Sequence, residues 1–396
     1  MEAGIRIPFS PDATNGSGWE KLFKEWRRLE IGDFVECLEE TLSIGSCRIL
    51  RLAENCAREW MPGHDTLSLA DTAKINATQS EDHLLREIWL TLLNCPVLLE
   101  FPSAEELMAA VRIRRNIAVN AARTCLNFHT SAIERPVDCW RYSEETGFVL
   151  IPGSPLIASL KKACQPKSGG GGRLFSNGLA MLEGQDDELL GEQLYSFSCY
   201  RATEYVILLS IAEEAQASNP ELLTLLQAQW EKKAISSGRF HDVFMDELGT
   251  LEEPLPLHYY VPGDRVWFRN PDPHSSDVPG FEGSWVFYLG GGLFANFWKC
   301  NQPFNLLTKC LEIHHWRDGA CKDGDGALQM DETKVEHLVA QTLKSPELTA
   351  RVFERMHRLR DGQGIYDEGG CMDATREAPK FVLPPHTDLI RALTAS

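Results

Sequence analysis

The sequence predicts an α+β fold, in which helices come first and antiparallel strands follow. Apolar residues recur three and four positions apart in the first part of the chain, which is the helical period. Two later segments, Asp264–Asn270 and Ser284–Lys299, are rich in aromatic and β-branched residues, which favour strands. Gly290–Gly292 interrupts the second segment and predicts a hairpin turn. Helices followed by antiparallel strands are the organisation of an α+β protein.

The composition limits the classes of function. A chain of 396 residues, 43% of them hydrophobic, can bury a sizeable core in one large domain or two. The formal net charge of −18 repels nucleic acid and anionic membranes, so neither is an expected partner. No segment is apolar enough to span a bilayer, and residues 1–15 lack the pattern of a secretory signal. The twelve cysteines are scattered without a CxxC pair, which favours reduced thiols and a cytoplasmic location.

The periodic pattern divides the chain into three regions. Residues 1–100 are expected to be a helical N-terminal region, residues 101–321 the core, and residues 322–396 a charged helical C-terminal tail. The helices expected in the first region cover Trp19–Leu29, Asp33–Leu42 and Glu81–Leu93.

The core region is expected to open with a long helix. Ser103 and Glu106 form a capping box, and the apolar period after them predicts a helix over Ser103–Asn127. Short extended pieces follow from Asp138. The run "SGGGG" at Ser168–Gly172 holds no regular structure and is expected to be a loop.

A second core helix is predicted to begin at Cys199. Ser198 can cap this helix, and Val206 and Ile211 belong to the apolar period that follows. Unpaired N–H groups and the helix dipole lower the pKa of a thiol at such a position, which favours a nucleophilic thiolate. The alternative is a small hydrophobic side chain in an ordinary core, because free cysteine is among the most buried residue types.

Five motifs that occur in order carry a family resemblance. They are "AEELMAAVRIRRNIAVNAARTC", "WRYSEETGFVL", "LYSFSC", "PGDRVWFRNPD" and "GSWVFYLGGGLFAN". From about Phe101 to about Lys299 the chain thereby resembles the small bacterial spore-coat transglutaminases, which are protein-glutamine gamma-glutamyltransferases. The resemblance implies a papain-like core, in which a buried helix with the nucleophile Cys199 at its N-terminus packs on antiparallel strands.

The same resemblance implies acid–base partners for the cysteine, but this chain has other residues at their positions. The family's catalytic Glu position is Ser284, its His position is Asn296, and the Glu before the nucleophile is Ser198. Serine and asparagine do not titrate near neutral pH, although Asn296 can orient a group or donate to an oxyanion. Glu282 is two residues from Ser284 and would share its strand face, so it is the candidate replacement.

Other titratable residues near these motifs have simpler interpretations. His258 is a second candidate replacement, and for both His258 and Glu282 a solvated or structural role is the alternative. Asp264 belongs to the "PGD" turn and is interpreted as a turn former.

We expect neither a metal nor a cofactor. The segment "CKDGDGALQMDE", Cys321–Glu332, partly matches a calcium-binding loop, but its first position is a cysteine and a hard cation gains little from a thiol. His314 and His315 are adjacent, and in an extended segment they would face opposite ways.

The leading functional hypothesis is a protein-glutamine gamma-glutamyltransferase. A Cys199 thioester would pass the acyl group of a glutamine carboxamide to an amine, or to water in a deamidation. The expected partners are therefore protein glutamine and lysine or another amine. The alternative is a catalytically inactive transglutaminase-like module that binds a protein in the same cleft.

Overall fold

The computed structural model describes twelve stretches of the chain. They are residues 4–8, 15–42, 45–53, 77–124, 127–128, 140–143, 147–164, 196–233, 237–299, 302–360, 370–380 and 382–383. The loop predicted at Ser168–Gly172 lies outside these residues.

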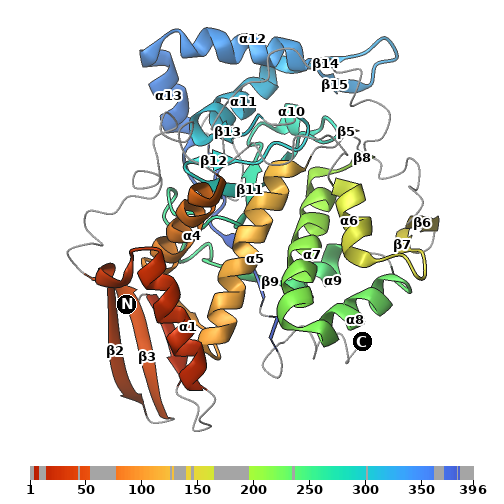
Figure 1. Cartoon of the computed structure of the whole chain (residues 1–396). Helices are drawn as coiled ribbons and strands as arrows, with labels where there is room; N and C mark the ends of the chain where they lie inside the picture. Colours follow the sequence, from red (N-terminus) through yellow and green to blue (C-terminus); the bar gives the residue numbers. More distant parts are fainter. Residues whose placement is uncertain are drawn as a thin grey trace.

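The N-terminal region combines helices with a small sheet. Helices α1 (Asn15–Arg28) and α4 (Ala77–Leu93) confirm two of the predicted helices. A four-stranded sheet with the order β2-β3-β1-β4 lies beside them (Figure 1). Its strands are β1 (Gly4–Pro8), β2 (Val35–Leu42), β3 (Gly45–Leu52) and β4 (Leu98–Glu100).

The helix predicted over Asp33–Leu42 is wrong, because most of this segment is strand β2. Every residue of β2 is paired with one of β3. Ion pairs cross between the strands, from Arg51 to Glu36 at 3.0 Å and from Arg48 to Glu39 at 3.3 Å. Cross-strand pairing of this kind overrides a local pattern that also fits a helix.

The core region is built from two long helices and a six-stranded sheet. Helix α5 (Ala104–Arg123) begins as predicted, since the backbone N–H of Glu106 donates to the Ser103 hydroxyl at 3.2 Å. Helix α7 (Cys199–Ser218) lies beside α5 (Figure 1). The sheet has the order β13-β12-β11-β10-β16-β9. Its strands are β9 (Met245–Leu248), β10 (Arg265–Arg269), β11 (Gly283–Gly290), β12 (Leu293–Phe294), β13 (Phe304–Asn305) and β16 (Arg376–Pro379).

Shorter elements complete the described part of the chain. The helices are α6 (Leu156–Cys164), α8 (Pro220–Trp230), α9 (Ser237–Phe244), α10 (Pro273–Ser276), α11 (Leu306–Gly319), α12 (Glu332–Leu343) and α13 (Pro346–Met356). Three two-stranded sheets pair β5 (Asn127–Phe128) with β8 (Ser196–Phe197), β6 (Trp140–Ser143) with β7 (Gly147–Leu150), and β14 (Ala320–Lys322) with β15 (Leu328–Met330).

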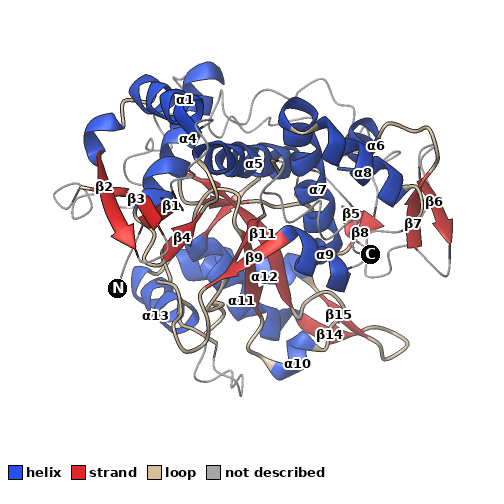
Figure 2. Ribbon diagram, turned by 90° about the horizontal axis from the view of Figure 1, so that it is seen from below, coloured by secondary structure: helices blue, strands red, loops and turns tan. Residues whose placement is uncertain are grey.

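Helices cover both faces of the six-stranded sheet. Figure 2 shows α5 and α7 on one side of β11 and α11, α12 and α13 on the other. Successive residues of β11 alternate between the two layers: Phe287 packs in the cluster around α5 and α7, and Val286 packs in the cluster around α11. The α+β prediction, with the Cys199 helix packed on antiparallel strands, is confirmed.

The tail contributes to the core sheet. Strand β16 lies between β10 and β9 and pairs antiparallel with both, with Glu377 opposite Arg265. Helices α12 and α13 confirm the helical character predicted for the tail. The division of the chain at residues 100 and 321 stays a prediction.

A buried ion pair joins α5 to the turn before β10. A guanidinium nitrogen of Arg114 donates to Asp264 at 2.6 Å, and the second oxygen of Asp264 accepts the backbone N–H of Val261 at 2.8 Å. Gly263 has a φ of +90°, and a Cβ there would lie 2.7 Å from the carbonyl oxygen of Arg114. Asp264 is thus a turn former, as interpreted, and also the partner of a buried cation.

Substituting Asp264→Asn is therefore expected to destabilise the fold strongly. Both side chains of the pair are buried, and removing one charge leaves the other uncompensated, which costs about 3–5 kcal/mol. Asp373→Asn is the matched control, because its partner Arg269 is 43% exposed and such pairs contribute about 0–1 kcal/mol. Urea unfolding measures both, and equal losses would contradict the prediction.

Candidate active site

The thiol of Cys199 is fixed at the start of α7. Ser198 has an extended backbone and its hydroxyl accepts the backbone N–H of Arg201 at 3.3 Å, so it caps the helix as expected. The following residues, including Val206 and Ile211, are buried in the core between α5, α7 and β11. Cys199 itself is half-buried and lies in the first turn of this helix, whose position the core contacts fix.

Cys199 lies against the edge of β11. The backbone N–H groups of Trp285 and Tyr200 lie close enough to its sulfur to favour the thiolate. Strand N–H groups lie in the plane of the sheet, so the contact with Trp285 places the thiol at the strand edge. Among the described residues, β12 pairs with β11 around Tyr288 and Gly290 and no strand pairs with this edge at Trp285, where the thiol lies.

Burial dominates the electrostatics of the thiol. It raises the pKa of Cys199 above the ordinary value, and the N–H groups of Trp285 and Tyr200 lower it by less. The Glu282 carboxylate also raises this pKa, and the Lys309 ammonium opposes it. The net effect differs from the sequence-based expectation, which considered the helix N-terminus but not the desolvation of the first turn.

Ser284 directly precedes Trp285 on β11, so it adjoins the strand residue whose N–H faces the thiol. Ser284 is opposite Phe268 on β10, and Trp285 is opposite Trp267. Adjacent strand residues face opposite ways, so the Ser284 side chain lies on the α11 side of the sheet. The hydroxyl there cannot replace a carboxylate as an acid or base.

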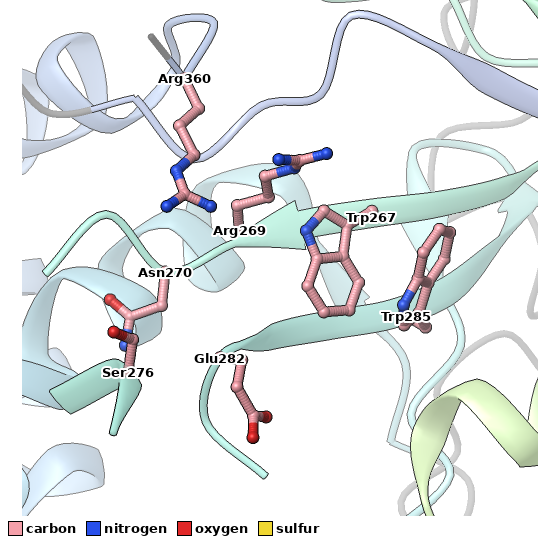
Figure 3. Close-up of a pocket in the computed structure, with 7 residues that line it drawn as sticks. All are labelled: Trp267, Arg269, Asn270, Ser276, Glu282, Trp285 and Arg360. Carbon is pink, nitrogen blue, oxygen red and sulfur yellow. The ribbon is translucent and has the colours of Figure 1, made fainter. Parts of the chain in front are cut away.

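A cavity of about 420 Å³ opens beside the thiol contact. The indole rings of Trp267 and Trp285 form its wall, with centroids 4.7 Å apart. Figure 3 shows Arg269 and Arg360 on one side of Trp267 and Glu282 on the other. Sequence reasoning found Glu282 but missed the two tryptophans, because their contact depends on the register between β10 and β11.

The other predicted site residues have different surroundings. The amide oxygen of Asn296 accepts the backbone N–H of Lys299 at 3.3 Å, within a turn that follows the pairing of Ala295 with Phe287. His258 is exposed, and its charge acts on His357 at the end of α13.

Lys309 is a cation near the thiol that the sequence reasoning missed. It is buried at the start of α11, 2.8 Å from the Glu312 carboxylate and 4.2 Å from the centre of the Phe304 ring. Its charge favours the thiolate of Cys199. No sequence signal marked it, since a lysine in an amphipathic helix is normally exposed.

The segment Cys321–Glu332 covers most of the hairpin of β14 and β15 and ends at the first residue of α12. One oxygen of Asp323 accepts the backbone N–H groups of Asp325 and Ala327, at 2.9 and 2.8 Å. Within the described ranges, no three His, Cys, Asp or Glu side chains are grouped to hold a metal ion. Likewise, no helix in that part of the chain is long and apolar enough to cross a membrane.

A helix-borne thiol held at the edge of an antiparallel sheet defines a cysteine-centred α+β protein. The chain belongs to the protein-glutamine gamma-glutamyltransferase family, whose sequence profile matches residues 66–338. The resemblance inferred from the motifs is thereby confirmed, over a longer span than Phe101–Lys299. Residues 1–65 and 339–396, which include β16, lie outside that match.

A transglutaminase is among the solved structures that match the chain. The enzyme from Geobacillus stearothermophilus, without its C-terminal extension, aligns with a TM-score of 0.37 and 17% identity, covering 60% of this chain and 98% of that chain. No curated protein matches the chain significantly.

The raised pKa predicts how the reactivity of Cys199 depends on pH. Only the thiolate is alkylated, and its fraction increases about tenfold per pH unit below the pKa. Labelling of Cys199 by iodoacetamide, followed by peptide mass spectrometry, is therefore expected to keep increasing above pH 8.5. Cys164, whose burial raises its pKa to about 12, is an internal control that should stay unlabelled. A plateau for Cys199 below pH 8.5 would contradict this prediction.

Proposed function

We propose that the protein is a protein-glutamine gamma-glutamyltransferase in which Cys199 is the nucleophile. The observation that carries the proposal is the thiol held on the Trp285 N–H beside a tryptophan-walled cavity that contains one carboxylate. Membership of the family supports the substrate class, a protein glutamine and an amine. The indole rings provide an apolar wall for the aliphatic stems of both side chains.

The proposed reaction has two steps. The Cys199 thiolate attacks the glutamine carboxamide, a thioester forms, the C–N bond breaks, and the leaving nitrogen takes a proton and departs as ammonia. A lysine amine then attacks the thioester, loses a proton, and releases the thiolate; water as acceptor gives deamidation. In this proposal Glu282 moves these protons and Asn296 only orients neighbouring groups, because an amide does not titrate.

Removing the proposed nucleophile and the proposed acid–base group tests the assignment. Cys199→Ala is expected to abolish incorporation of a fluorescent amine into a glutamine-bearing protein. Glu282→Gln is expected to lower it by about 10²–10⁴-fold, the usual contribution of acid–base assistance. Glu252→Gln removes an exposed carboxylate of the same chemistry and should leave the rate unchanged. Full activity of Cys199→Ala would exclude Cys199 as the nucleophile.

Restoring the missing carboxylate discriminates the enzyme from its rival. Ser284→Glu puts a carboxyl group beside the contact of Cys199 with Trp285, and it is expected to raise the rate of amine incorporation. The rival, an inactive module that binds a protein, is supported by the raised pKa of the thiol and by Ser284 itself. The binding module would be favoured if the wild type and Ser284→Glu are both folded but neither incorporates the amine nor releases ammonia.

A further inference from the structure

A second cavity, of about 330 Å³, lies between α11 and α13 and shares no residue with the one beside Cys199. Its polar lining comes from His314, His315, Arg317 and Asp318 on α11 and from Arg351 and Arg355 on α13. The sequence did not predict this cavity, because His314 and His315 were expected in an extended segment. They lie instead in α11, with ring centroids 4.9 Å apart.

The lining of this cavity is positively charged in a strongly acidic protein. Three guanidinium groups face one carboxylate, which leaves a formal charge of +2 in a chain of net charge −18. The Asp318 carboxylate already lies 3.2 Å from Nδ1 of His315 and 3.7 Å from Nε of Arg317. An anion is therefore the ligand type that the cavity attracts.

Arg351 and Arg355 are a like-charged pair one helical turn apart. Within the described ranges, no carboxylate lies within 4.0 Å of either guanidinium; the acidic residue between them on α13, Glu354, is paired with Arg358 at 3.5 Å. Like charges four residues apart destabilise a helix, and the described contacts of α13 do not compensate this pair. A bound anion between the two guanidinium groups would.

The two histidines differ in what they offer a ligand. Nδ1 of His315 faces Asp318, and its Nε2 lies 2.8 Å from the Thr342 hydroxyl on α12, so both nitrogens are in use. Burial is the largest cause that lowers the pKa of His314 to about 4; the charges of His315, Arg317 and Arg355 act in the same direction, and the Asp318 carboxylate opposes them. His314 is therefore neutral at pH 7 and lies in a positive field.

We propose that this cavity binds the phosphate group of a small phosphorylated molecule. Guanidinium groups from two facing helices can each bind two oxygens, which suits the several oxygens of a phosphate. A phosphate dianion balances a lining charge of +2, whereas a single carboxylate does not. The volume is near the lower end of small-molecule sites, about 300–1,000 Å³, which fits a small ligand better than a macromolecule.

Calorimetric titration of the full chain with inorganic pyrophosphate, at constant ionic strength, tests the proposal. One saturable site is expected for the wild type. Arg351→Ala and Arg355→Ala are each expected to weaken binding about 10-fold, equivalent to about 1.4 kcal/mol. Arg355→Lys keeps the charge but loses the bidentate geometry, so its affinity for pyrophosphate should lie between those of the wild type and of Arg355→Ala. Arg358→Ala, which removes a guanidinium outside the cavity, should bind like the wild type.

Three results would overturn the proposal. They are the absence of saturable binding by the wild type, equal weakening by Arg358→Ala, and binding of citrate as tightly as pyrophosphate. Tighter binding of a phosphoserine peptide than of pyrophosphate would replace the small ligand by a protein partner and so overturn the assignment as well. The wild-type titration can refute the site by itself, so the proposal stays testable even if a variant fails to fold.

Discussion

The buried guanidinium of Arg265 is the constraint on which the candidate site depends. Arg265 lies on β10 and is fully buried, so its charge needs a partner from another element. It donates to Glu377 on β16 and, at 3.2 Å, to the Thr203 hydroxyl on α7. It also stacks on two aromatic rings, 4.9 Å from the centre of Tyr200 and 4.8 Å from that of Trp285.

These contacts set the position of the thiol. Tyr200 follows Cys199 in the chain, and the backbone N–H of Trp285 on β11 favours the Cys199 thiolate. One cation therefore holds both neighbours of the sulfur, and Glu377 comes from the tail outside the family match. A chain that ended at residue 338 would leave Arg265 without its carboxylate and the cavity without Arg360. The tail thus belongs to the structure of the site, although the sequence pattern separates it.

Local patterns predicted the elements, and pairing decided the rest. The capping residues Ser103 and Ser198 and the aromatic strands are local features, and the structure has them where the sequence indicated. The periodicity in Asp33–Leu42 fits a helix and a strand alike, and only its pairing with β3 separates them. The contact of Trp267 with Trp285 likewise needs the register of two strands, and the buried cation Lys309 needs the packing of α11.

Two separate deficits act on the proposed chemistry, and they respond differently to pH. Burial raises the pKa of Cys199, so a smaller fraction of this thiol is ionised at neutral pH than of an ordinary cysteine. In the proposed reaction, the missing proton transfer at Ser284 costs about 10²–10⁴-fold unless Glu282 supplies it. Raising the pH removes the first deficit but leaves the second. The balance between enzyme and binding module therefore depends more on the proton-transfer partner of Cys199 than on the ionisation of its thiol.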